Sequence, residues 1–345
     1  MIIGSGANRY KWIDNWAKIP DTQSASEGWA HHGMAVTEAG EIIGFHQGDA
    51  TVLVFDTDGE IIKSWTIPVR EAHQMALAYQ GTKTYLWVAD PGNKNVKVNG
   101  KYASAQGEWG GQVLRMTLGG QIDTRITTPE HEAYEAGKFA PTSVAVYQST
   151  RGGNDDIWIS DGYGESYVHR YTASGEYIRS ISGEEGDAGR FACPHGVWID
   201  YRKSEPELLI ADRTNRRVQV YDLEGKYKRH FGSDVLNSPS GFAIDGDQLI
   251  VAELRARLAV FDRDDVFVCY IGENERIARV ERNSREDGPG WPNNLDSNGH
   301  VIRPTILEAG KFNSPHGLAA DSDGNLYVGE WLVGGRYTKL VKQQS

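Results

Sequence analysis

Three histidines stand at equivalent places in a phrase that this sequence repeats. His73, His195 and His316 each open a short apolar stretch, and successive members of the set are 122 and 121 residues apart. Imidazole binds zinc and other divalent transition metals, including iron, nickel and cobalt. Three protein ligands with a fourth position open to water or substrate are typical of a catalytic zinc site. The spacing therefore predicts a metal site, with Zn²⁺ as the first candidate.

The other histidines receive different interpretations. His32 opens the first repeat, so it is a candidate fourth ligand or proton-transfer group, or else a spectator. His31 lies beside it, and we expect it to point away and to be structural. A lone histidine at a strand start is more often a hydrogen-bonded residue than a ligand. The metal site is therefore predicted from the recurrence of histidine at equivalent positions of three units. Four histidines without repeat partners are interpreted as surface residues: His131, His169, His230 and His300.

The elements that must position these residues come from a sixfold internal repeat. Each unit has a strand start, a short apolar strand, a turn, and a second strand that ends in a small residue and a polar one. The first strands start at His32, His73, Pro141, Pro194, Pro239 and Pro315, and the second strands end at His46, Asp90, Asp161, Asp212, Glu253 and Glu330. Two further strands follow in each unit except the last, which has one. Four short strands in each of six units of roughly 40 to 50 residues predict an all-β, six-bladed β-propeller.

The last unit lacks a fourth strand, and residues 10–13 are expected to supply it and close the ring. Residues 1–345 then form a single β-propeller domain. Alternate blades of six lie about 120° apart, which would bring the three histidines to one axis. A β-sandwich gives no reason for six similar phrases. The polar stretch 272–312 interrupts the repeat, and it is expected to be either a lid over the channel or a surface loop. Trp291 within it either contacts the substrate or anchors the loop.

Acidic residues end the second strand of nearly every unit. This regularity favours a structural role, in which the carboxylates accept hydrogen bonds from neighbouring strand-start amides. Asp161 and Asp212 are also placed to hold a nearby arginine or tyrosine, and to support the histidine ligands.

Composition excludes several classes of function. A net charge of −11 argues against general binding to nucleic acids or anionic membranes, which are themselves negative. No stretch approaches 18 apolar residues, and the first residues lack the pattern of a signal peptide. Two cysteines, Cys193 and Cys269, make no disulfide framework, so we expect a cytoplasmic protein. The expected partner is a small-molecule substrate.

Five stretches of the chain carry a family resemblance: 139–146, 159–164, 194–196, 211–216 and 314–317. They resemble the NHL-repeat propellers, and among them the peptidyl-α-hydroxyglycine α-amidating lyases and their bacterial relatives. The resemblance implies zinc held by the three histidines, Tyr163 as a base or proton shuttle, and Arg213 holding a negative group. The alternatives are that Tyr163 packs beside the channel and that Arg213 forms a salt bridge to Asp161 or Asp212.

Two departures from the family pattern bear on the substrate. Gln47 stands where the family has a catalytic arginine, and it supplies no fixed positive charge. Gly317 follows the last histidine, where the amidating lyases have an aspartate for structural calcium. The interpretation is therefore a zinc-dependent, lyase-type enzyme for a small hydroxylated polar substrate, with Tyr163, Arg213, His32 and Gln47 as catalytic candidates. A lactonase- or esterase-like propeller hydrolase and a non-catalytic NHL interaction platform are the alternatives.

Overall fold

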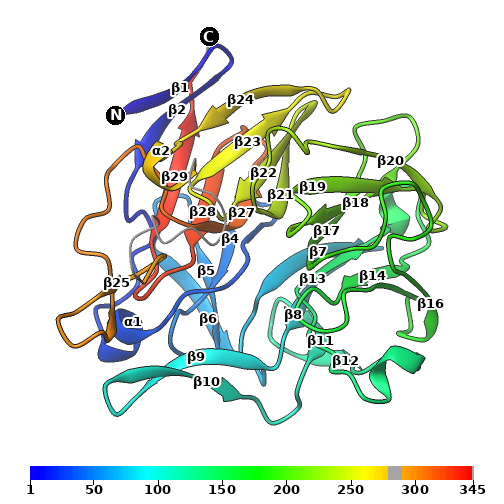
Figure 1. Ribbon diagram of the computed structural model, residues 1–345, viewed down its shortest axis with the longest axis horizontal. Helices are drawn as coiled ribbons and strands as arrows, with labels where there is room; N and C mark the ends of the chain where they lie inside the picture. The colour runs from blue at the N-terminus through cyan, green and yellow to red at the C-terminus, as the bar shows by residue number, and fades with distance from the viewer. Residues whose placement is uncertain (279–289, 344–345) are drawn as a thin grey trace. The chain divides into compact units, whose positions relative to one another are not determined.

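The chain folds as an all-β, six-bladed propeller, in which strands follow one another up and down within each sheet. The computed structural model describes residues 1–278 and 290–343 (Figure 1). The prediction of fold class from the sixfold repeat is confirmed. By contacts between residues the chain divides into two compact units, the first made of residues 1–66, 94–105 and 243–345 and the second of residues 67–93 and 106–242.

The second unit holds blades two, three and four. Blade two contains β7 (Gln74–Gln80), β8 (Lys83–Asp90), β11 (Gln112–Thr117) and β12 (Ile122–Ile126). Blade three contains β13 (Ser143–Val146), β14 (Ile157–Ser160), β15 (Val168–Tyr171) and β16 (Tyr177–Ile181). Blade four contains β17 (Pro194–Asp200), β18 (Glu207–Asp212), β19 (Arg217–Tyr221) and β20 (Tyr227–Phe231). The innermost strand β13 packs beside both β7 and β17, which brings the first strands of three blades together.

The first unit holds blades one and six and most of blade five. Blade one contains β3 (Ala35–Val36), β4 (Ile42–Phe45), β5 (Thr51–Phe55) and β6 (Ile61–Thr66). Blade five contains β21 (Pro239–Asp245), whose first four residues belong to the second unit, and β22 (Gln248–Glu253), β23 (Arg257–Phe261) and β24 (Phe267–Ile271). Blade six contains β27 (Pro315–Ala320), β28 (Leu326–Glu330) and β29 (Tyr337–Lys342). Strand β27 packs beside β22 and β3.

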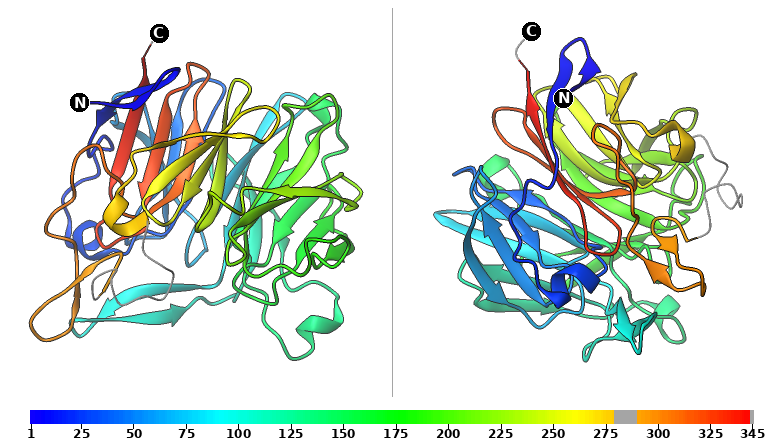
Figure 2. Two further views of the ribbon diagram at one scale, coloured as in Figure 1. Left: turned by 45° about the horizontal axis from the view of Figure 1, so that its top comes forward. Right: turned by 90° about the vertical axis from the view of Figure 1, so that its left-hand side faces the viewer.

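Blade six is completed by the other end of the chain. Strand β2 (Asn8–Ile13) pairs antiparallel with β29, with Trp12 opposite Leu340, so the expected closing strand is confirmed. A strand that the repeat did not predict, β1 (Ile2–Ser5), pairs with β2 and forms the edge of the sheet. Figure 2 shows these N-terminal strands beside the C-terminal strand. The sheet thereby joins chain segments more than 300 residues apart and closes the ring.

Burial follows the position of each strand in its blade. The second and third strands of a blade are almost wholly buried, as in β18 and β19, and most of their residues are apolar. Outermost strands alternate between exposed and half-buried residues, as in β20, because one face contacts solvent. In blades three and four, the side chains of Trp158, Ile181 and Tyr221 belong to one buried hydrophobic cluster. This packing gives the strand starts a rigid base.

Short elements fill the segments that interrupt the repeat. They are α1 (Gln23–Glu27), the hairpin of β9 (Asn93–Val98) and β10 (Lys101–Gln106), the 3₁₀ turns η1 (Glu132–Tyr134) and η2 (Ser149–Arg151), α2 (Glu275–Ala278), and the hairpin of β25 (Asn294–Leu295) and β26 (Val301–Ile302). The predicted insertion 272–312 lies in part outside the described residues. No helix in the described ranges has the length and apolar character that a membrane span requires.

Candidate metal centre

Two buried histidines lie side by side in the second unit. His73 directly precedes β7 and His195 is the second residue of β17, so each stands at the start of an innermost strand. Both side chains are fully buried, and their ring centroids are 4.7 Å apart. The repeat therefore places these two imidazoles together, as their equivalent positions predict.

Both rings are held by backbone carbonyls at equivalent places in the following blades. Nδ1 of His73 lies 2.6 Å from the carbonyl oxygen of Thr142, and Nδ1 of His195 lies 2.7 Å from that of Ser240. A carbonyl only accepts, so Nδ1 carries the proton and Nε2 carries the lone pair. Histidines that bind a metal take this arrangement, because the hydrogen bond at the other nitrogen fixes tautomer and ring orientation.

The first unit contains a second pair of histidines. His316 is the second residue of β27 and is fully buried, and its Nδ1 lies 3.3 Å from the carbonyl oxygen of His32. His32 opens blade one as Thr142 opens blade three, so the same device holds all three predicted ligands. The ring of His31 lies 4.5 Å from that of His316. The expectation that His31 points away is therefore wrong.

The reason for that error is local backbone structure. Alternation of side chains holds within a strand, whereas residues 31–34 precede β3 and form no strand. Within the described residues, His31, His73, His195 and His316 form a group that could hold a metal ion. Neutral imidazoles suit zinc, iron, nickel, cobalt and copper, so the donor set fits a transition metal without selecting one.

Glycine follows two of these histidines for a steric reason. A Cβ atom at Gly196 would lie 2.8 Å from the carbonyl oxygen of Ser240, and one at Gly317 would lie 2.5 Å from that of His32. These are the same carbonyls that hold the histidine rings. The Pro-His-Gly phrase thus allows the acceptor to approach, and it leaves no room for an aspartate at position 317.

Tyr163 and Arg213 adjoin the histidine pair of the second unit. The Tyr163 hydroxyl lies 3.2 Å from Nε2 of His73 and 3.1 Å from Nε2 of His195, and it accepts a hydrogen bond of 3.2 Å from Arg213. The guanidinium also lies 5.2 Å from the centre of the tyrosine ring. Burial raises the pKa of Tyr163 to about 12, against the opposing effect of Arg213. The two residues therefore face the atoms that would bind a metal.

His32 and Gln47 lie in a buried network of the first unit. Nε2 of His32 is 2.7 Å from the hydroxyl of Tyr337, and that hydroxyl donates to Oε1 of Gln47 over 3.2 Å. The Gln47 amide also donates to the carbonyl oxygen of Ala25. Burial lowers the pKa of His32 to about 3, so its ring is neutral. Tyr337, on β29, was missed by sequence reasoning, because aromatic residues at this strand position normally pack in the core. The catalytic roles predicted for His32 and Gln47 stay predictions.

The acids that end the second strands hold the strand starts, as predicted. Asp90 accepts hydrogen bonds from the amides of Arg70 and Glu71, Asp161 from Ala140, Asp212 from Ala192, and Glu330 from Asn313 and Ser314. Asp161 also accepts from the Tyr134 hydroxyl and Asp212 from Arg217, so the expected tyrosine and arginine partners are present. These contacts fix the segments that lead into the histidines.

One prediction for an isolated histidine fails. His169 is fully buried in the middle of β15, not on the surface. Its Nε2 lies 2.7 Å from the Tyr134 hydroxyl and its Nδ1 lies 2.7 Å from the Ser180 hydroxyl. The partner Tyr134 comes from the insertion after blade two, which no repeat pattern describes. His230 is exposed, as expected.

Comparisons with known proteins agree with this fold and with the resemblance. No family model matches the chain. Human NHL repeat-containing protein 3 is 28% identical over 239 residues, which are 67% of this chain and 62% of that protein. Peptidyl-alpha-hydroxyglycine alpha-amidating lyase 1 of Drosophila melanogaster is 25% identical over 390 residues, covering 95% of this chain and 63% of that protein. The chain thus spans about three fifths of these relatives.

Solved structures show the same architecture. A streptogramin B lyase structure matches with a TM-score of 0.56 at 15% identity, over 97% of this chain and 98% of that chain. Virginiamycin B lyase from Staphylococcus aureus matches with a TM-score of 0.56 at 16% identity, over 96% and 99%. The chain is an NHL-repeat six-bladed β-propeller, related to peptidyl-α-hydroxyglycine α-amidating lyase and similar in fold to bacterial virginiamycin B lyase. Its sequence relatives thus include lyases.

Proposed function

We propose that this chain is a metal-dependent lyase that acts on a small hydroxylated polar substrate, with zinc as the first candidate metal. The observation that carries the proposal is the shared geometry of His73, His195 and His316. Each ring has its Nδ1 hydrogen-bonded to a strand-start carbonyl. A divalent ion held by these residues and His31 would supply a Lewis acid for a substrate oxygen.

Tyr163 would move the proton in this reaction. Its hydroxyl lies within hydrogen-bonding reach of both histidines of the second unit, and Arg213 donates to the same oxygen. Burial opposes ionisation of Tyr163, so the phenolate would need the charge of a bound divalent ion in addition to that guanidinium, and it could then take the proton of a substrate hydroxyl. The proton would then pass to the leaving atom as the bond to the hydroxyl-bearing carbon breaks, which gives a carbonyl product without a redox cofactor.

The substrate is proposed to differ from that of the amidating lyases. Gln47 has no charge and is engaged with Ala25 and Tyr337, so it does not replace the family's arginine as an anion-binding group. A neutral, hydroxyl-rich compound fits this position as well as a hydroxyglycine does. A calcium-dependent hydrolase is less well supported, because the candidate group in the described residues consists of imidazoles, whereas calcium takes oxygen ligands. We propose a cytoplasmic location, in line with the free cysteines Cys193 and Cys269.

The test is an activity screen against compounds that carry a hydroxyl on the carbon bearing the leaving group, with release of a carbonyl product as the readout. Tyr163→Phe should lower kcat by about 10²- to 10⁴-fold, the usual contribution of a positioned acid or base. Tyr147→Phe is the matched control, because its hydroxyl contacts only the carbonyl of Gly152 among the contacts described. Unchanged turnover in Tyr163→Phe would remove this residue from the mechanism.

A further inference from the structure

Four aromatic side chains form a continuous face that begins at the histidine pair of the first unit. This aromatic face consists of Trp29, His31, Trp291 and Trp331. The ring of Trp331 lies 5.5 Å from His31, 6.0 Å from Trp29 and 6.0 Å from Trp291. His31 in turn lies 4.5 Å from the buried His316. The face is therefore joined directly to candidate metal ligands.

Partial exposure separates these rings from the tryptophans of the core. All four members of the aromatic face keep an intermediate exposure, whereas Trp87 and Trp158 are fully buried within their blades. Exposed aromatic surface of this kind is available to a ligand. Large, rigid rings gain contact area at a low cost in conformational entropy, which is why they are frequent in binding sites.

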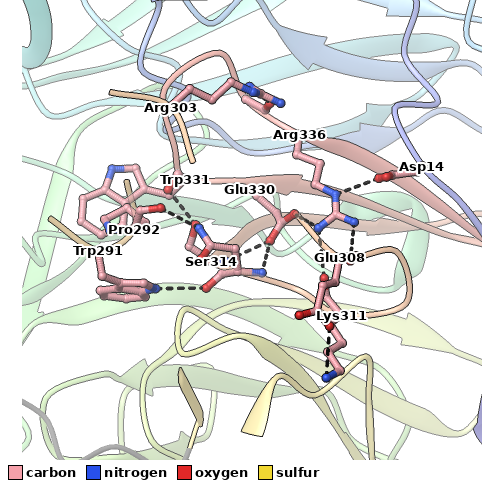
Figure 3. Close-up of polar contacts among 12 residues, drawn as sticks. Asp14, Trp291, Pro292, Arg303, Glu308, Lys311, Ser314, Glu330, Trp331 and Arg336 are labelled. Atoms are coloured by element: carbon pink, nitrogen blue, oxygen red, sulfur yellow. Dashed lines mark hydrogen bonds and ion pairs between the residues drawn. The ribbon is translucent and has the colours of Figure 1, made fainter. Parts of the chain in front are cut away.

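Hydrogen bonds hold Trp331 through its backbone and Trp291 through its ring nitrogen. The amide of Trp331 donates to the carbonyl of Ser314 over 2.8 Å, and the Ser314 hydroxyl donates to the carbonyl of Trp331 over 2.7 Å. Nε1 of Trp291 donates to the carbonyl of Asn313 over 3.3 Å. Figure 3 shows Trp291 and Trp331 beside Ser314. Ser314 and Asn313 immediately precede the strand that carries His316. The segment of Asn313 and Ser314 thus fixes Trp291 and Trp331 close to the candidate metal ligand His316.

A buried cation supports the outer ring. The guanidinium of Arg255 lies 4.8 Å from the centre of the Trp291 ring, and Arg255 is only 5% exposed. A cation over one face of an indole is attracted by the ring electrons and holds the ring in place. Because the rings are ordered beforehand, a ligand that stacks on them loses little of its binding energy to ordering.

We propose that the aromatic face binds a planar ring of the substrate, so that this protein selects substrates with an aromatic group near the hydroxyl-bearing carbon. The inference rests on the proposed function for the position of the reacting carbon. It adds a substrate class, since stacking favours a flat π-system over a saturated ring of similar size. The insertion that contributes Trp291 would then serve recognition.

The test compares two carboxylates of equal charge and similar size, benzoate and cyclohexanecarboxylate, on metal-free protein by ligand-observed NMR titration. Wild type should bind benzoate about 2- to 10-fold more tightly, the range expected for an aromatic pair. Trp331→Leu should abolish that preference. Trp109→Leu should retain it, because Trp109 is 52% exposed and lies outside the aromatic face. Trp331→Phe retains a ring and should keep most of the preference. If Trp331→Leu does not fold, Trp29→Leu replaces it, because it removes another ring of the aromatic face and should reduce the preference.

Equal binding of the two carboxylates by wild type, or an unchanged preference in Trp331→Leu, would overturn the inference. Zinc affinity is measured separately by calorimetry on the same proteins. Zinc binding without a ring preference refutes the aromatic face alone. A ring preference in a protein that binds no metal refutes the proposed lyase, and it leaves the face as a binding site for planar compounds.

Discussion

Substitution of Gly196 by alanine tests how the backbone positions a candidate ligand. The added Cβ would lie 2.8 Å from the carbonyl oxygen of Ser240, which is 0.6 Å short of the 3.4 Å at which ordinary contacts begin. That oxygen belongs to the backbone, so it cannot rotate away. It also accepts the hydrogen bond from Nδ1 of His195 at 2.7 Å. Relief of the clash must therefore disturb the contact that orients the His195 ring.

Two magnitudes follow from this geometry. Overpacking of a close contact destabilises a protein by about 1–3 kcal/mol, which thermal or denaturant unfolding of the metal-free protein would measure. Loss of the hydrogen bond that orients a ligand typically weakens metal affinity by about 10- to 100-fold. Competition between the protein and a chromophoric chelator for zinc measures that second effect. Gly196→Ala should show both changes.

Gly119→Ala is the matched control for this experiment. Gly119 lies in an exposed turn, and an added Cβ would meet only the Thr117 hydroxyl at 3.4 Å, an ordinary contact. Both stability and zinc affinity should stay at the wild-type level. If Gly196→Ala binds zinc as tightly as wild type does, the carbonyl contact does not position His195 for a metal, and the reasoning fails.

Three further predictions concern other parts of the chain. Glu330→Ala leaves two buried amides before His316 without an acceptor, each worth about 1–3 kcal/mol, so denaturant unfolding should show a loss of about 2–6 kcal/mol. Glu330→Gln keeps an acceptor and should lose less stability, and equal losses in the two variants would contradict the capping role. Burial lowers the pKa of His169 to about 3, so below pH 6.5 the unfolded chain takes up a proton that the folded chain does not. Between pH 6.5 and 3, the free energy of unfolding of wild type should therefore fall by about 1.4 kcal/mol per pH unit relative to that of His169→Gln. Parallel stability curves for these two proteins would show that the ring is not held neutral. His31→Ala should lower zinc affinity measurably, whereas His230→Ala, at an exposed position, should not; equal affinity in both variants would exclude His31 as a ligand.

Regular elements of the fold could be predicted because blades that pack in the same way need similar residues at equivalent positions. Blades two, three, four and six each have buried inner strands and a carboxylate that holds the start of the blade's own first strand, so apolar stretches and terminal acids recur along the chain. Asp90, Asp212, Glu253 and Glu330 end their strands in the structure as the sequence indicates. The pairing of β2 with β29 followed from the need to complete the last blade.

Irregular segments could not be predicted in the same way. His31 precedes its strand, so strand alternation does not govern its direction, and sequence reasoning assigned the wrong side. His169 is buried because it lies in the third strand of its blade, and its partner Tyr134 comes from an insertion that has no counterpart in other blades. The positions of His73, His195 and His316 thus follow from periodicity, and the surroundings of these candidate ligands follow from contacts that are specific to this chain.

The most direct test of the account is the metal content of the purified protein. Elemental analysis after gentle purification in zinc-containing buffer should find about one transition-metal equivalent per chain in wild type. His195→Ala should lose it, because the imidazole held by Ser240 would be removed. Wild-type protein without bound metal, or a His195→Ala variant that retains the full equivalent, would contradict the assignment of these histidines to a metal centre.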